Sequence, residues 1–464
     1  MLPSARGCRT DVTAFGHQLA VGGSVTIAVP HLVVVTAKGA KGDAPTSSLA
    51  RSFRLTILSY LLVPLTALVT GPLLAHALGP EGRGKLAAVL APLALANIVA
   101  TFGFQEAATY FVARAEISSR RIARLAVVCS VAAGALAALV LFLLAPTMLV
   151  NAPDMVVPLQ LLALSLPVTI GFAGARGVVS GTQAFGRVSM ERGAGSVGRL
   201  LVLGLMVVTV GLTATNAATV SVIVPIAASL VLIGPALQRT GGDAPLRLPR
   251  FLDYSLHASI GTIGGILILQ LDQALMTPLS TTEQLGFYAV AVSLASLPAA
   301  AVQGVRDVVF SYSSVASDPQ LVARSTRVSV AVGLPVVLIG ALLCNPVVPF
   351  LFGADFEPAV TMARVLLVAV LPNTVSSVMG AGLMSVGRPR VRSAILMGGA
   401  ALTVLLIIAL VPHYGGDGAA IASLLTYTTI ALISVIVFTR ITGVSVRDCL
   451  VVRRSDLVLR RRRP

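Results

Sequence analysis

The stretch LTILSYLLVPLTALVTGPLLAHALGPEGRGKL (Leu55–Leu86) is a long apolar run that ends in a glycine-rich octet. In the octet, Gly79–Leu86, a glycine, four residues and then Gly-Lys reproduce most of a phosphate-binding P-loop. A P-loop needs Ser or Thr where Leu86 stands, because a hydroxyl there binds magnesium. Another apolar run follows, over residues 86–112. We therefore predict a turn between two membrane helices, not a nucleotide site.

The composition indicates a chain that lies in lipid. Of its 464 residues, 56% are hydrophobic and 11% are charged, and the mean hydropathy is +0.92. Soluble proteins contain about 25% charged residues. The net charge of +16 comes from short basic clusters between apolar runs, without interleaved aromatic residues. Such clusters are typical of charges that set membrane orientation, so no nucleic-acid partner is expected.

Apolar runs of about 20 residues, each long enough to span a bilayer, recur along the chain. We predict an all-α polytopic membrane protein with twelve transmembrane helices. The predicted spans are 55–78, 86–112, 123–149, 156–182, 197–212, 218–238, 254–279, 285–313, 328–351, 358–385, 393–412 and 418–439.

Most of the 34 lysines and arginines lie in the two tails and in the even-numbered connections between spans. The odd-numbered connections hold only Arg83 and Lys85. Because cytoplasmic loops retain positive charge, we expect both termini to be cytoplasmic. Residues 1–53 are predicted to be a poorly ordered cytoplasmic extension, and residues 443–464 a basic cytoplasmic tail.

The two halves of the chain repeat short motifs at a nearly constant offset. Gly103-Phe-Gln-Glu106 recurs as Gly304-Val-Arg-Asp307, and Gly186-Arg187 recurs as Gly387-Arg388, both 201 residues later. Glu81 with Gly84 recurs as Glu283 with Gly286. Six spans in each half give both halves the same orientation. We therefore predict two six-helix bundles, residues 54–240 and 241–442, that are parallel repeats with a substrate site between them.

Ionisable residues inside predicted spans are candidates for the central cavity, because each costs about 2.5–3.5 kcal/mol on insertion scales. The six candidates are Glu106, Arg176, Asp272, Arg306, Asp307 and Arg364. Similar depths allow Glu106 to pair with Arg176 and Asp272 with Arg364, and ion pairs that only fix packing remain an alternative. For Arg176 a substrate role is favoured, because the small neighbours Gly174 and Gly177 leave its guanidinium open to a phosphate.

No motif supports catalysis, and odd connections of about five to seven residues leave no room for a catalytic domain. The four cysteines are scattered without metal-ligand spacing. We therefore predict that the protein is not an enzyme, with no catalytic residue, no metal site and no cofactor.

Several segments resemble bacterial polysaccharide flippases of the multidrug/oligosaccharidyl-lipid/polysaccharide exporter superfamily. In the second half these are FLDYSLHASIGTIGGILILQLDQALMTPLSTTEQLGFYAVAVSLASLP (Phe251–Pro298), LFGADFEPAVTMARVLL, SVGRPR and VPHYGGDGAAIASLL. In the first half they are LGPEGRGKLAAVL and GVVSGTQAFGR. The likeness extends over residues 51–442.

The resemblance implies a V-shaped exporter fold that opens alternately to each side of the bacterial cell membrane. The implied cargo is an undecaprenyl-diphosphate-linked oligosaccharide, with membrane lipid, a polysaccharide polymerase and glycosyltransferases of the same pathway as further partners. Arg176 and then Arg364 would contact the diphosphate. Asp272 matches the acid in the seventh span of the family and would couple transport to a cation. A multidrug efflux transporter and a lipid II flippase are the alternatives.

Overall fold

In a computed structural model, residues 46–114, 117–238, 240–242, 248–314 and 319–450 are described, and helices make up nearly all of them. Seven of these helices are long and apolar enough to cross a membrane, or eight if one bent pair counts as a single span. The all-α membrane fold is confirmed, whereas the count of twelve spans stays a prediction.

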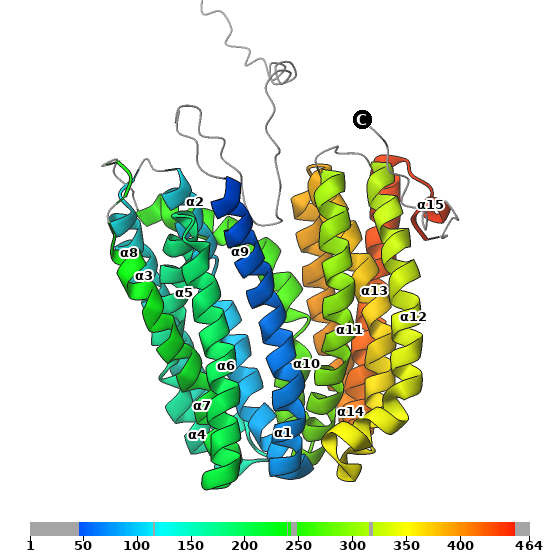
Figure 1. The fold of residues 1–464 in the computed structure, drawn as a ribbon. Coiled ribbons are helices and arrows are strands. Elements are labelled where there is room, and N and C mark those ends of the chain that lie inside the picture. The colour runs from blue at the N-terminus through cyan, green and yellow to red at the C-terminus, as the bar shows by residue number, and fades with distance from the viewer. Residues whose placement is uncertain (1–45, 115–116, 239, 243–247, 315–318, 451–464) are drawn as a thin grey trace, which may run out of the picture.

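The helices form two bundles, which we call the first and second lobes (Figure 1). The helices of the first lobe are α1 (Thr46–Thr101), α2 (Phe104–Ala113), α3 (Ser119–Met148), α4 (Val156–Ala163), α5 (Leu166–Gly181), α6 (Phe185–Thr209), α7 (Ala214–Ser229) and α8 (Ile233–Leu237), with the 3-10 turns Pro153–Met155 and Leu230–Leu232. Helix α9 (Leu248–Leu267) packs on α2 of the first lobe and on α14 of the second. The helices of the second lobe are α10 (Leu271–Leu279), α11 (Thr282–Ser314), α12 (Pro319–Phe352), α13 (Ala359–Ser385), α14 (Pro389–Thr442) and α15 (Val446–Leu450), with the 3-10 turn Ala354–Phe356.

Two of the longest helices are each divided by a glycine. In α1 the backbone leaves the helical region at Gly79, with φ 66° and ψ −178°, and in α14 it does so at Gly415, with φ 53°. Only glycine adopts such positive φ values without strain. The predicted turn Gly79–Leu86 therefore folds back as a hairpin. Within it, Lys85 Nζ lies 3.0 Å from carboxylate oxygens of both Glu81 and Asp154, which ties the hairpin to the α3–α4 connection.

The two ends of the described chain differ from the predicted boundaries. Helix α1 begins at Thr46, inside the predicted N-terminal extension, of which the remaining residues lie outside the described ranges. In the predicted tail, α15 packs on α12 and buries Cys449. Burial raises the pKa of the Cys449 thiol, so it stays protonated and behaves as a small apolar side chain.

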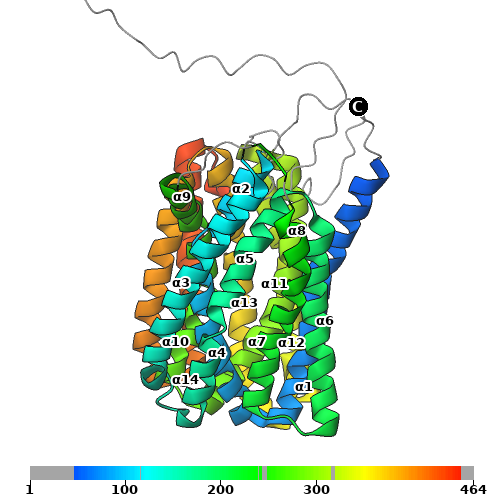
Figure 2. The same ribbon diagram turned by 90° about the vertical axis from the view of Figure 1, so that its left-hand side faces the viewer.

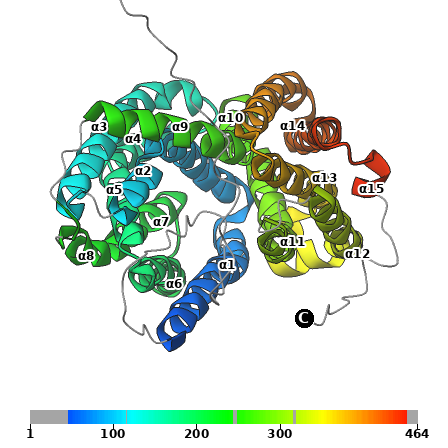
Figure 3. The same cartoon turned by 90° about the horizontal axis from the view of Figure 1, so that it is seen from above.

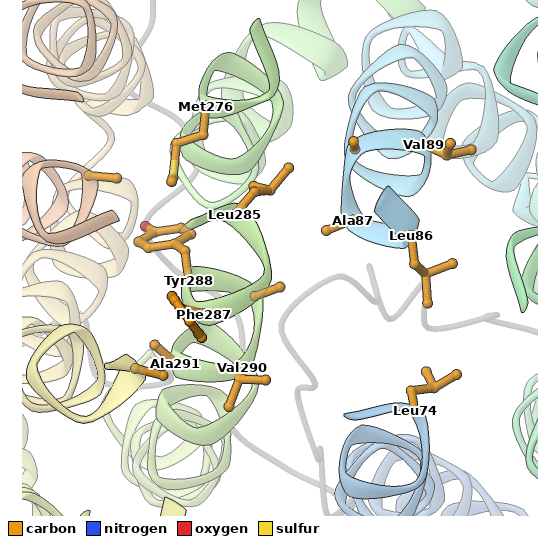
Figure 4. Packing of buried hydrophobic residues seen from close by; sticks show 14 of the residues in the cluster. Leu74, Leu86, Ala87, Val89, Met276, Leu285, Phe287, Tyr288, Val290 and Ala291 are labelled. Atoms are coloured by element: carbon orange, nitrogen blue, oxygen red, sulfur yellow. The ribbon is translucent and has the colours of Figure 1, made fainter. Parts of the chain in front are cut away.

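Large apolar side chains cover the outward faces of both lobes, as expected for surfaces in contact with lipid. Val208 of α6 is 84% exposed, and Phe350 of α12 is 83% exposed. The main buried cluster lies where the lobes meet, near the Gly79 hairpin. Figure 4 shows Leu86 and Ala87 of α1 on one side of this contact, with Leu285 and Tyr288 of α11 on the other.

The lobes approach closely enough there that only glycine fits. A Cβ on Gly84 would lie 1.6 Å from the Thr282 carbonyl oxygen, and a Cβ on Gly286 would lie 2.1 Å from the Pro80 carbonyl oxygen. Gly84 and Gly286 are equivalent positions of the two repeats. The hairpin end of the molecule is thus closed by backbone-to-backbone packing between the lobes.

Candidate functional site

A cavity of about 310 Å³ lies in the first lobe between α1, α5, α6 and α7. Figure 3 shows α6 beside α1 and α7 at one edge of this lobe, and Figure 2 shows α6 and α1 along the same edge from the side. The lining residues are Thr66, Ala67, Arg176, Glu191, Arg192, Gly195, Ser196, Arg199 and Pro225. We call this cavity the arginine pocket.

Glu191 is the acid that pairs with Arg176. Arg176 donates from Nε to Glu191 Oε2 at 2.9 Å and from a terminal nitrogen to Oε1 at 2.5 Å. Ser229 Oγ donates to the same Oε1 at 2.8 Å, and Glu191 is only 4% exposed. A buried carboxylate with a bidentate arginine and a hydroxyl donor is well satisfied. The charge of Arg176 is therefore largely balanced within the lobe.

The other arginines of the pocket leave it positively charged. Arg192 and Arg199 line it together with Arg176, against the single acid Glu191. From the hairpin, Arg83 lies close enough to Arg199 for their charges to repel. The Arg83 Nε atom is buried and has no hydrogen-bond partner among the described residues. Buried like charges are unfavourable unless an anion compensates them, so this group of arginines is suited to bind an anion.

The predicted pairing of Arg176 with Glu106 is wrong. The fifth span was expected at residues 197–212, whereas α6 begins at Phe185. Glu191 and Arg192 therefore lie on a membrane helix and not in a cytoplasmic connection. The charged residues lower the hydropathy of the first half of α6, and for this reason the predicted span began at residue 197 instead of 185. Arg192, Ser196 and Arg199 are spaced i, i+4 and i+7, and this spacing was the available sign of one polar helix face.

The predicted pair of Asp272 with Arg364 is also wrong. The chain breaks between α9 and α10, so Asp272 lies in the first turn of α10 and points into the second lobe. Tyr288 donates its hydroxyl to Asp272 Oδ2 at 2.6 Å, and the Gln273 amide donates to Oδ1 at 2.8 Å. Asp272 is 4% exposed. Arg364 instead lies on an exposed face of α13 and donates from Nε to the Ala341 carbonyl oxygen at 3.2 Å.

The remaining candidates form no cluster in the described part of the chain. Glu106 is half-buried on α2 and has no ion-pair partner within the described ranges. Arg306 and Asp307 lie on α11, but their side chains are outside what the structure describes. Among described residues, no group of three His, Cys, Asp or Glu is arranged to hold a metal ion.

Replacing Glu191 with glutamine is expected to lower the melting temperature of the purified protein by about 4 °C or more. The change leaves the buried Arg176 charge without its carboxylate, and breaking one side of a buried pair costs up to about 3–5 kcal/mol. Differential scanning fluorimetry in detergent measures the shift. Glu106→Gln, at a half-buried acid on α2 without an ion-pair partner in the described ranges, is the control and should change little. A melting temperature in Glu191→Gln equal to the wild type would show that the pair contributes no stability.

The two helical lobes, several of whose helices are long and apolar enough to cross a membrane, make this a multi-pass membrane protein, and its similarity to the proteins that follow places it among flippases and transporters, not enzymes. The sequence model of the family described as polysaccharide biosynthesis protein matches residues 49–314, and the chain belongs to this family. No curated protein matches the chain by sequence.

Solved structures share the exporter fold at low sequence identity. Lipid II flippase MurJ in an inward closed conformation superposes with a TM-score of 0.68 at 13% identity, over 86% of this chain and 89% of that one. A multidrug resistance MATE family transporter in an inward-facing conformation gives 0.65 at 14% identity, over 83% and 98%. An outward-facing MATE family transporter gives 0.55 at 15% identity, over 84% and 95%. The V-shaped exporter fold is thereby confirmed.

Proposed function

We propose that this protein moves an undecaprenyl-diphosphate-linked oligosaccharide from the inner to the outer leaflet of the bacterial cell membrane, for surface polysaccharide biosynthesis. In this proposal the two lobes rock about the substrate in alternating access, and both termini are cytoplasmic. A polysaccharide polymerase and glycosyltransferases of the same pathway would be its partners.

The observation that supports this cargo best is the excess of arginines in the arginine pocket. A diphosphate carries several negative charges, and arginine binds phosphate through two parallel hydrogen bonds. We assign the diphosphate to Arg199, Arg192 and Arg83, with Arg176 held in place by Glu191. A cationic drug would be repelled by the same charges, so the pocket disfavours multidrug efflux.

Asp272 has a separate proposed role. It is a buried acid that accepts a hydrogen bond from Tyr288 of α11, and the Tyr288 hydroxyl also lies 3.3 Å from Ser423 Oγ of α14. Both helices pack on α10 in the second lobe. Asp272 lies directly after the break between α9 and α10, and α9 also contacts α2 of the first lobe. A cation or proton that binds Asp272 would therefore act on a helix pair that contacts both lobes.

Deleting the gene is the test of the proposed cargo. We expect lipid-linked repeat units to accumulate on the cytoplasmic face and surface polymer to be lost, with peptidoglycan synthesis unchanged. Radiolabelled lipid extracts and a membrane-impermeant periodate assay measure where the repeat units are. Arrest of peptidoglycan synthesis with intact surface polymer would indicate a lipid II flippase. Unchanged polymer with new dye sensitivity would indicate efflux.

A further inference from the structure

Arg364 lies in a second cavity, of about 440 Å³, away from the arginine pocket. The cavity lies between α12 and α13 in the second lobe, and its lining residues are Asn345, Glu357, Val360, Thr361 and Arg364. Its volume falls within the range of about 300–1,000 Å³ that small-molecule sites occupy. We call it the outer groove.

The outer groove opens on the lipid-facing surface and not on the interior of the lobe. Thr361, Arg364 and Val368 are exposed and follow one another at i, i+3 and i+7, which places them on one face of α13. The neighbouring surface of α12 carries Leu342, 75% exposed, and Phe350, 83% exposed. Side chains this apolar are expected to contact acyl chains.

The depth of Arg364 matches the region of lipid head groups. It is five residues beyond Ala359, the first residue of α13, which corresponds to about 8 Å at 1.5 Å per residue. This helix start lies at the hairpin end of the molecule, since Gly353, just before it, approaches His76 of α1. Head groups occupy roughly the outer 5–8 Å on each side of the hydrocarbon core. In the predicted orientation, the groove therefore faces the extracytoplasmic leaflet.

The groove holds two opposite charges that do not neutralise each other. Among the described residues, Glu357 and Arg364 form no ion pair within 4.0 Å. The Nε atom of Arg364 donates a hydrogen bond to the Ala341 carbonyl oxygen. The two residues are seven positions apart, with Glu357 just before α13 and Arg364 in its second turn. Guanidinium has five N–H donors, so its terminal nitrogens remain available, with Asn345 and Thr361 beside them.

We propose that the outer groove binds the head group of a zwitterionic phospholipid that carries a primary amine. The phosphate binds Arg364, with Asn345 and Thr361 as further hydrogen-bond donors, and the ammonium group binds Glu357. The acyl chains lie along the exposed apolar face of α12. A lipid held in this way seals the α12–α13 surface of the second lobe. The site is independent of the cargo proposed for the arginine pocket.

Native mass spectrometry of the full-length protein, with phosphatidylethanolamine, phosphatidylcholine or phosphatidylglycerol added in detergent, tests this site. The wild type is expected to retain phosphatidylethanolamine at least about tenfold better than the other two. Arg364→Gln should lose this binding, and Arg364→Lys should keep part of it. Glu357→Gln should bind phosphatidylethanolamine and phosphatidylcholine equally. Arg390→Gln, an exposed arginine at the start of α14, is the control and should behave as the wild type.

Three results would overturn the proposal. The first is retention of phosphatidylethanolamine by Arg364→Gln at the level of the wild type. The second is equal retention of all three lipids by the wild type, or a preference for phosphatidylglycerol, either of which excludes a role for the amine. The third is equally strong binding of soluble glycerophosphoethanolamine, because the head group would then bind without contact between acyl chains and α12. Melting temperatures of all variants show whether each remains folded.

Discussion

Replacing Gly84 with alanine is expected to reduce export more than tenfold while the protein is still made and inserted. The added Cβ would lie 1.6 Å from the Thr282 carbonyl oxygen, so the backbones of the two lobes must separate. Overpacking of this kind costs about 1–3 kcal/mol, and each 1.4 kcal/mol shifts a conformational equilibrium tenfold. The variant would therefore disfavour the conformation in which the lobes are closed at the hairpin end. The transporter must return to this conformation before it can bind the next substrate.

An export assay and a labelling assay together measure this effect. A cysteine at Ala87, in the contact between the lobes, should react faster with an impermeant maleimide added from outside when Gly84→Ala is present than when it is absent. Gly204→Ala is the matched control, because a Cβ at Gly204 of α6 meets no atom within 4 Å. Gly286→Ala should reproduce the Gly84 phenotype. Full export by Gly84→Ala would show that this contact does not control the cycle.

The contact between the lobes at Gly84 and Gly286 could be predicted from the sequence only indirectly, through the internal repeat. Gly84 and Gly286 were recognised as equivalent positions because Glu81 and Glu283 precede them by the same interval. Related positions of parallel repeats lie close to the axis that relates the lobes, and there they can touch. The hairpin at Gly79 was predicted from different evidence, a turn sequence between two apolar runs.

The ion pairs could not be predicted, because they depend on which way each helix face points. Asp272 was matched with Arg364 on depth alone, whereas the break before α10 turns the carboxylate toward Tyr288. Glu191 was missed because a hydropathy window treats a helix with one charged face as a connection. Membrane helices can carry such a face when it borders a cavity and its charges have partners.

If the arginine pocket binds an anion, its arginines should lower the stability of the empty protein and be required for export. Arginines that only pack the helices would not lower stability. Arg83 and Arg199 repel each other in the first lobe, and no acid of the described chain forms an ion pair with either guanidinium. Protein stability is commonly reduced where a site is arranged for a charged ligand. The pocket should therefore be less stable empty than with a bound anion, and removing one arginine should reveal this.

Replacing Arg199 with glutamine is expected to weaken binding of undecaprenyl diphosphate about 10- to 100-fold and to abolish most export. Each charge-assisted hydrogen bond to phosphate contributes about 1.5–3 kcal/mol. The same change should raise the melting temperature of the protein without ligand, because the repulsion with Arg83 disappears. Arg199→Lys keeps the positive charge but cannot form two parallel hydrogen bonds to phosphate, so it should retain part of the binding.

The measurement is the melting temperature of each purified variant with and without undecaprenyl diphosphate, beside the export assay. Arg187→Gln is the control, since Arg187 is exposed in the first turn of α6 and does not line the pocket. A packing role for Arg199 would instead lower the melting temperature and the export together. A destabilised Arg199→Gln protein whose ligand-induced shift equals that of the wild type would exclude the assigned diphosphate contact. Opposite changes in stability and binding are expected only if the protein holds Arg83 and Arg199 together for an anion that the chain itself does not supply.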